Sequence, residues 1–369
     1  MATCDDVRVS LTVDITGVPP EQLLFAASPL AELTAMLHVL AVPGHHPAWQ
    51  DWAARTRTAL EPDLAERLAE AEFLWRSSRA DFLLPGRPGA SLAEELDTVD
   101  RLDDHVYVAA ALTTTCGSDR TLFGLPSPLA DARVRARALD LAQARGPQQA
   151  SFADRLMADP ASVRARVRRT LEDCGPAFFD ATWQRVHPQL GADLRLKADL
   201  MARRGLADTL ASVSGSVGLD PARRTIVVDK LQDNRADATG GGLTFVPTVF
   251  GRPHLVVVHA PGWRPVMQYP VATAEESAPV PMELVRLRLD ALAHPVRLRL
   301  LRTLARGPHT TGELASAWDL SAPEVSRHLA LLRRAGLLTT RRRGRYVLYE
   351  LDASTTADLG PDLLDALLR

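Results

Sequence analysis

The chain has few of the residues that build disulfide-linked or membrane-spanning structures. Its three cysteines, Cys4, Cys116 and Cys174, are odd in number and far apart, which is typical of a reducing compartment. Their isolation excludes a disulfide framework and a cysteine zinc cluster. No run of about 18 uncharged apolar residues occurs, so we predict no membrane-spanning helix. Acidic residues near the start and the lack of an apolar segment there argue against a secretory signal, so we expect a cytoplasmic protein without a membrane partner.

Lysine is also scarce, because only Lys197 and Lys230 accompany the arginines among 43 basic residues. We attribute this bias to the composition of a GC-rich genome. The charge is unevenly spread: residues 281–352 carry thirteen arginines against seven acidic residues, a net charge of +6, whereas residues 1–280 carry −6. A basic C-terminal segment on an acidic body predicts a polyanionic partner for that segment alone.

The length of 369 residues predicts two or three domains. Residues 7–13 alternate as in a strand, but apolar spacing in residues 1–212 is otherwise mostly helical, with Ser28 and Pro29 at a helix start. Short β-branched runs in residues 213–271 favour antiparallel strands. Residues 272–281 read as a linker, and 282–369 as the second domain. The predicted fold class is α+β, mainly α: a helical N-terminal domain with a small antiparallel β cluster, then a winged helix-turn-helix.

Two capped helices joined by a tight turn lie in the basic segment. Thr310 with Glu313, and Ser321 with Glu324, have the spacing of capping boxes, and residues 319–320 form the turn between them. On the second helix the residues Val325, Leu329 and Leu332 fall on one apolar stripe. The pattern predicts a helix-turn-helix whose second helix buries that stripe.

The opposite face of this helix and the following hairpin carry the candidate DNA contacts. Residues 337–340 and 346–351 can pair as strands with an arginine-rich tip, where each guanidinium offers a fork of donors to phosphate. A single arginine is more often a solvated surface residue, but the ordered combination predicts binding to double-stranded DNA. His328 fits equally a phosphate donor or a packed imidazole, and His294 fits a helix boundary. The predicted DNA-binding residues are Thr310, Ser321, Pro323, Ser326, Arg327, His328, Arg333, Arg334, Arg341, Arg342, Arg343 and Arg345.

The stretches LAHPVRLRLLRTLARG, TGELA and LSAPEVSRHLALLRRAGLLTTRRRGRYVLYEL resemble the ArsR/SmtB family of winged-helix repressors. The resemblance covers about 70 residues, which together make one winged-helix unit. It implies a homodimer on an inverted-repeat operator, a recognition helix at residues 321–334, a wing on the flanking backbone and repression lifted by an inducer. It also implies that a terminal helix, here with Leu359, Leu363, Leu364 and Leu367 on one stripe, packs against the first helix in the dimer. A stray surface helix is the alternative.

Two departures from the family pattern change what the resemblance implies. Residues 311–318 lack the cysteine pair of the metal sensors, and no histidine follows Asp352. Metal sensing at those family sites is therefore not expected, and we expect a small-molecule or other non-metal signal. Ala322 and Pro323 also stand where the family often has hydrogen-bonding residues, which weakens the base-reading end of the helix.

The N-terminal part has a second resemblance. A strand near the start, a helix that begins Ser28-Pro29-Leu30, the stretch GGGLTFVPTVFGRPHL and the tripeptide Gln268-Tyr269-Pro270 are similar to a large uncharacterised domain. That domain precedes ArsR-type winged helices in many actinobacterial regulators. The resemblance supplies an architecture and no chemistry.

The N-terminal part shows no catalytic motif. Residues 240–242 are three glycines without the following Lys-Ser/Thr of a phosphate loop, so a turn or a close backbone approach is favoured. Residues 215–218 lack the spacing of a nucleophile elbow. Residues 103–105, and His254 with His259, could supply metal ligands, but solvated helix charges and strand-end imidazoles are favoured. We expect no catalytic residue, metal or cofactor.

The role of residues 1–271 has three candidate interpretations. They could form a sensor and dimerisation domain for a small-molecule effector, an enzyme domain fused to an autoregulatory repressor, or a scaffold that sets half-site spacing. The lack of an acid, base and nucleophile constellation favours the sensor. Aromatic residues at helical spacing are usually core, although they could wall an apolar cavity: Trp49, Trp52, Phe73, Trp75 and Trp183.

Overall fold

The computed structural model describes residues 10–76, 78–117, 126–229, 234–271, 280–343 and 346–368. The chain divides into two compact units, Met1–Glu275 and Glu276–Arg369, called unit 1 and unit 2 below. Residues 272–279 of the expected linker, together with Cys4, Lys230 and Arg345, lie outside the described residues. Across the described residues, no helix is long and apolar enough to cross a membrane.

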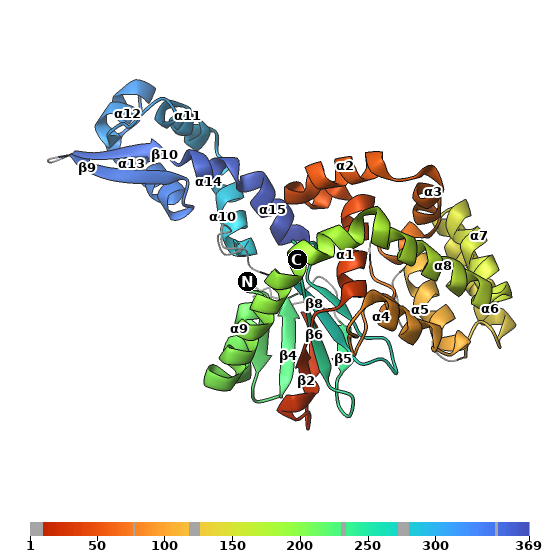
Figure 1. Ribbon diagram of the computed structural model, residues 1–369. Helices are drawn as coiled ribbons and strands as arrows, with labels where there is room; N and C mark the ends of the chain where they lie inside the picture. The colour runs from red at the N-terminus through yellow and green to blue at the C-terminus, as the bar shows by residue number, and fades with distance from the viewer. Residues whose placement is uncertain are drawn as a thin grey trace. The chain divides into compact units, whose positions relative to one another are not determined.

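Unit 1 contains two four-stranded sheets (Figure 1). In the first, β1 lies between an antiparallel neighbour, β4, and a parallel neighbour, β5. In the second, β6 lies between two parallel neighbours, β2 and β8, and β7 adds an antiparallel edge. The strands in sheet order are β3 (Val217–Asp220), β4 (Thr225–Asp229), β1 (Ser10–Asp14) and β5 (Asn234–Asp237), then β2 (Leu23–Phe25), β6 (Leu243–Thr248), β8 (Val266–Pro270) and β7 (Val256–Val258).

The predicted fold class was wrong in its account of the strands. They form two mixed sheets rather than one small antiparallel cluster. Strand β1 overlaps the strand expected at residues 7–13, whereas β2 comes from the region expected to be helical. Local alternation shows that a strand exists but not which strand pairs with it. Parallel pairs also need long connections, and the helices between β2 and β6 provide one.

Helix α1 (Pro29–Ala41) is almost entirely buried within unit 1. As predicted, α1 begins at Ser28, whose side chain accepts a hydrogen bond from the Ala31 amide, with Pro29 in the first turn. Its residues from Pro29 to Leu40 are all buried, and it contacts both β6 and the helices α2 and α4. The other helices are α2 (Gln50–Ala59), α3 (Pro62–Ala71), α4 (Leu92–Asp100), α5 (Asp104–Cys116), α6 (Ala132–Arg145), α7 (Pro147–Ala158), α8 (Pro160–Cys174) and α9 (Asp180–Val213).

Short helical turns join β1 to β2 and several of these helices to one another. They are η1 (Pro20–Gln22), η2 (Pro43–His45), η3 (Pro47–Trp49), η4 (Glu72–Leu74), η5 (Asp81–Leu83) and the π turn η6 (Gly175–Phe179). In α9 the backbone leaves helical geometry at Gly205, where φ is 80°. Glycine adopts this conformation without the steric cost that a side chain would add.

Two large apolar cores hold unit 1 together. The first joins α1 to the surrounding helices around Trp75 and Tyr107. The second lies between the two sheets and α9, where Ile226 of β4 and Phe245 of β6 belong to one buried cluster with Leu210. The sheets are therefore coupled through a shared core as well as through the chain.

Unit 2 has the elements predicted for a winged helix-turn-helix. Its strands β9 and β10 form an antiparallel hairpin, which we call the wing. A bridge between His309 and Tyr349 ties the start of the helix-turn-helix to β10. The elements are α10 (Met282–Leu292), α11 (Pro295–Leu304), α12 (Thr311–Trp318), α13 (Ala322–Arg334), β9 (Leu338–Arg343), β10 (Tyr346–Leu351), α14 (Ala353–Ala357) and α15 (Leu359–Leu368).

Candidate nucleic-acid interface

Side-chain caps fix the turn between α12 and α13. The Thr310 hydroxyl accepts from the Glu313 amide at 3.2 Å, and the Glu313 carboxylate accepts from the Thr310 amide at 2.7 Å, so the first capping box is complete. The Ser321 hydroxyl accepts from the Glu324 amide at 3.3 Å. Between the helices Asp319 is left-handed, with φ of 50°, and this conformation ends α12 sharply.

The predicted stripe of α13 is buried. Val325, Leu329 and Leu332 are fully covered within the core of unit 2. On the other face, the side chains predicted to contact DNA are exposed: Ser321, Pro323, Ser326, Arg327, Arg333 and Arg334. The period of the helix thus places these six residues on solvent-exposed surface.

The wing extends further than the sequence indicated. Arg341, Arg342 and Arg343 were expected at the tip, but they lie within β9, opposite residues of β10. Because side chains alternate along a strand, Arg341 and Arg343 share one face of the hairpin and Arg342 occupies the other. All three are exposed. Arg345, the fourth predicted member of this group, lies outside the described residues.

The arginines of α13 and β9 differ from several arginines of unit 1. Among the described residues, we find no hydrogen bond or ion pair within the chain for Arg327, Arg333, Arg334 or residues 341–343. In unit 1, by contrast, Arg67, Arg164 and Arg168 each pair with acidic side chains. A guanidinium without an internal partner can bind phosphate with no ion pair to break, and its fork of donors suits that geometry.

Thr310 and His328 differ from the other predicted contacts. The Thr310 hydroxyl is already engaged with Glu313 in the cap. His328 is half-buried with its ring centroid 4.9 Å from that of His294, and its Nδ1 is buried without a hydrogen-bond partner. Burial and the neighbouring His294 lower the pKa of His328. His294 caps α11 by accepting from the Val296 amide at 3.2 Å, which confirms its role as a boundary residue.

The first and last helices of unit 2 pack together within one chain. Arg288 of α10 is 8% exposed, and its Nη1 lies 2.5 Å from Oδ2 of Asp362 on α15. Apolar side chains stay exposed on these helices, with Met282 at 40%, Leu289 at 40% and Leu367 at 54%.

In unit 1, Asp103 and Asp104 have structural roles. Asp103 caps α5, Asp104 pairs with Arg164, and His105 Nδ1 lies 2.7 Å from the Ser127 hydroxyl oxygen. Each of the three side chains therefore has a partner within the chain and does not need a metal ion.

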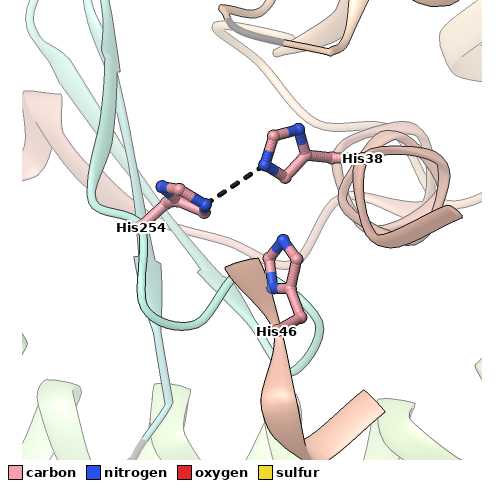
Figure 2. Close-up of side chains that lie close together, drawn as sticks. All are labelled: His38, His46 and His254. Atoms are coloured by element: carbon pink, nitrogen blue, oxygen red, sulfur yellow. Dashed lines mark hydrogen bonds between the residues drawn. The ribbon is translucent and has the colours of Figure 1, made fainter. Parts of the chain in front are cut away.

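His254 belongs to a buried cluster that the sequence interpretation missed. It lies beside His38 and His46, and potential ligand atoms of the three residues lie within 4.8 Å of one another (Figure 2). The available signal was the adjacent pair His45-His46, one helical turn and a loop after His38.

The tryptophans expected either in the core or around a cavity belong to the core. Trp75 is buried, and Trp49 stacks on Phe250 with ring centroids 4.0 Å apart. A cavity of about 220 Å³ lies elsewhere, among α3, α7 and α8, with Arg67, Phe152 and Val163 in its lining. This is smaller than the roughly 300–1,000 Å³ usual for ligand pockets.

The glycines at residues 240–242 form a turn, as expected. Gly240 and Gly242 have φ of 76° and 78°, and a Cβ on Gly242 would clash with the Gln22 carbonyl oxygen. A close backbone approach therefore requires glycine at residue 242.

Comparison with known proteins assigns both units. Residues 9–275 match the family of unknown function DUF5937, and residues 292–341 match a helix-turn-helix domain family. Over 75 residues the chain is 41% identical to the biofilm growth-associated repressor of Agrobacterium fabrum, covering 20% of this chain and 64% of that one. Over 79 residues it is 42% identical to the arsenic resistance transcriptional regulator ArsR1 of Pseudomonas putida, covering 21% and 58%. The matched segment thus spans less than two thirds of these relatives.

A longer match agrees with this assignment. The chain is 36% identical over 95 residues to a probable mercury resistance operon repressor of Streptomyces lividans, covering 26% of this chain and 75% of that one. The crystal structure of the repressor BigR from Xylella fastidiosa covers 22% of this chain and 83% of that chain at 36% identity, with a TM-score of 0.20. The chain therefore belongs to the DUF5937 family, and that family's domain is followed by a winged helix-turn-helix domain of the ArsR type.

Proposed function

We propose that this protein is a DNA-binding transcriptional regulator that acts as a homodimeric repressor. The observation that carries the proposal is the set of exposed arginines on α13 and β9, which have no partner in the described part of the chain. They lie next to a buried stripe that fixes the orientation of α13. The relatives in A. fabrum and S. lividans are both named as repressors. Repression is therefore the preferred mode of action.

In the proposed complex, the N-terminal half of α13 faces base edges in the major groove. Ser326 and Arg327 are the base-reading residues, since they are exposed near the start of the helix. Pro323 has no amide proton to donate and Ala322 no polar side chain, so this end reads few bases. Ser321 and Thr310 contribute mainly by holding the helix ends through their caps.

The other predicted contacts act on the phosphate backbone. Arg333 and Arg334 lie in the last turn of α13, and Arg341 to Arg343 lie along β9. Contacts of this type position the protein and supply salt-dependent affinity, but they do not discriminate between sequences. His328 still fits both a phosphate donor and a packed imidazole, since a half-buried ring can donate one hydrogen bond outward.

We place dimerisation on α10 and α15. Their exposed Met282, Leu289 and Leu367 supply an apolar surface, and the Arg288–Asp362 pair holds the two helices together in each chain. A twofold dimer binds two half-sites about one helical turn, roughly 34–36 Å, apart. An inverted-repeat operator follows from that symmetry.

For unit 1 we propose a sensor role that controls DNA binding. Burial raises the pKa of both the Cys116 and Cys174 thiols to about 12, so neither is a thiolate at neutral pH. These cysteines cannot act as nucleophiles there, which weakens the alternative of an enzyme domain fused to an autoregulatory repressor.

The test is selection of genomic DNA fragments by the full chain, followed by footprinting of the fragments recovered. We expect two protected half-sites in an inverted repeat, including one such site upstream of the protein's own gene. Protection of one half-site would contradict the dimer. Equal recovery of all fragments at physiological salt would contradict sequence-specific binding.

A further inference from the structure

Four histidines of unit 1 gather in one place, although they come from distant parts of the sequence. His38 lies on α1, His45 and His46 lie at the junction of η2 and η3, and His254 precedes β7. The ring centroids of all pairs are between 4.8 and 6.5 Å apart. Imidazoles are polar, so burying several together needs partners for their nitrogen atoms.

Two backbone carbonyls determine which ring nitrogens carry protons. His38 Nδ1 lies 3.0 Å from the Trp75 carbonyl oxygen, and His46 Nδ1 lies 2.5 Å from that of Arg252. Carbonyl oxygens only accept, so each Nδ1 must carry the proton and donate it. In the neutral ring the lone pair then lies on Nε2.

These Nε2 atoms face a shared space between the rings (Figure 2). His46 Nε2 is buried and has no hydrogen-bond partner among the described residues, which is costly for a buried acceptor. His38 Nε2 lies 3.1 Å from His254 Nε2. With the His38 proton on Nδ1, His254 is the donor in that contact.

We propose that His38, His46 and His254 form a binding site in unit 1 for one divalent transition-metal ion of the zinc, cobalt or nickel class. Two nitrogen ligands in a tetrahedral zinc site lie roughly 3.3 Å apart, from Zn–N distances of about 2.0–2.1 Å. The nitrogen separations here extend from 3.1 Å up to the 4.8 Å limit. Small side-chain rotations would bring all three nitrogens to that spacing.

The surroundings of the rings resemble those of metal-binding histidines. A ligating histidine usually donates its other N–H to a carbonyl or carboxylate, which holds the ring in place, and His38 and His46 both do so. Burial also lowers the pKa of both rings, that of His46 to about 4. Both rings are therefore neutral at neutral pH, and because each Nδ1 donates to a carbonyl oxygen, the lone pair of each Nε2 is available to a metal ion.

The donor set narrows the class of metal. Three imidazole nitrogens suit zinc, copper, nickel or cobalt, whereas magnesium and calcium prefer oxygen ligands. Because His45 has a buried Nδ1 without a hydrogen-bond partner, it can supply a fourth ligand after a side-chain rotation. Water can fill this position instead, as in sites with three protein ligands.

The positive charge of one nearby residue, Arg79, opposes the binding of a cation at this site. The buried Arg79 donates from Nη1 to the same Trp75 carbonyl oxygen at 2.6 Å, and its charge contributes to the lowered pKa of His38 and His46. This charge reduces the affinity for a dication, and it favours an anionic fourth ligand such as hydroxide or chloride. The site is distinct from the family's metal positions on the winged helix, and the proposal departs from our expectation that the chain holds no metal.

The experiment uses the untagged full chain, stripped with a chelator and titrated with Co²⁺ in the absence of DNA. We expect one equivalent to bind and to produce the visible d–d bands of a tetrahedral or five-coordinate nitrogen site. Zn²⁺ should displace it. X-ray absorption of the zinc-loaded protein should show imidazole nitrogens at about 2.0–2.1 Å. The absence of d–d bands, or a shell made only of oxygen ligands, would overturn the proposal.

Variants separate a metal site from a purely structural histidine cluster. His46→Gln and His254→Gln should each weaken Co²⁺ binding by at least about 100-fold, since loss of even an outer hydrogen-bond partner costs about 10–100-fold. His187→Gln, at an exposed position of α9, is the matched control and should bind as the wild type does. Equal affinity in all three variants would show that these histidines do not hold the metal. If circular dichroism shows that a variant is misfolded, the cobalt spectra of the wild-type protein still test the proposed metal site.

Metal binding and DNA binding are measured separately. Failure of the cobalt titration leaves the DNA-binding proposal intact, and the absence of an operator leaves the metal site intact. If both succeed, operator affinity with and without Zn²⁺ gives the coupling between them, which is typically 5–150-fold for an allosteric effector.

Discussion

Arg288 on α10 and Asp362 on α15 form a largely covered ion pair, with Nη1 and Oδ2 2.5 Å apart. The Arg288 Nε also donates to the Ala335 carbonyl oxygen at 3.4 Å, at the end of α13. One guanidinium therefore joins the two terminal helices of unit 2 to the helix that we assign to DNA.

Replacing Asp362 by Asn should destabilise unit 2 by about 3 kcal/mol, because it leaves the covered Arg288 charge without its partner. Chemical denaturation followed by circular dichroism measures the change. Asp290→Asn is the control on α10, since its pair with Arg286 is 3.4 Å long and exposed on both sides, and it should change stability by less than about 1 kcal/mol. Equal effects of the two substitutions would show that burial does not matter here.

Replacing Arg341, Arg342 and Arg343 together by Ala should weaken binding to all DNA sequences. Each lost phosphate contact should reduce the log–log salt slope of affinity by about 0.9. Fluorescence anisotropy across a salt series measures the slope. Arg203→Ala on α9, where Arg203 pairs with Asp199, should leave it unchanged. An unaltered slope in the triple variant would remove the wing from the interface.

Replacing Arg327 by Ala should change sequence preference, with a cost of about 1–3 kcal/mol on the preferred operator and less on operators altered at one base pair. Competition binding with single-substitution operators measures the pattern. Arg334→Ala, at the far end of the same helix, should weaken binding evenly across those operators. An even loss for Arg327→Ala would reassign this arginine to the backbone.

The stability of unit 1 should fall as pH rises from about 4.5 to above 7. Burial raises the pKa of Glu32 and Glu95 to about 7 from the ordinary 4.5. The folded state thus favours the protonated acids, and this advantage is present below pH 4.5 and is lost as pH passes 7. Through this linkage, each carboxyl contributes up to roughly 3 kcal/mol to the free energy of unfolding at low pH.

Glu32→Gln removes one of these titrations. The amide oxygen can still accept from the Val249 and Phe250 amides, which now donate to Glu32 Oε1 at 3.0 and 3.1 Å. We expect this variant to be more stable than the wild type at pH 8 and similar at pH 4, in melts recorded at each pH. Glu66→Gln at an exposed site of α3 is the control. An unchanged pH profile in Glu32→Gln would contradict the assignment to Glu32.

Local patterns in the sequence were enough to predict unit 2 almost completely. Capping residues, the Val325, Leu329 and Leu332 stripe and the arginine hairpin all act within a few residues of one another. The extent of β9 was missed, because arginine runs carry little strand signal. Unit 1 was less predictable, since its strand pairing and its histidine cluster depend on contacts between distant segments. A single sequence contains nothing to indicate that His38 and His254 lie close together in the fold.

The central position of β1 has a consequence for synthesis. Leu11 pairs with Val228 on one side and with Asn234 on the other, so β1 leaves the ribosome long before either neighbour exists. The nascent chain must keep this strand unpaired while the helices between them form, and contacts of such long sequence separation slow folding. Truncated chains that end before β4 would expose both edges of β1, and we expect them to aggregate or to be degraded.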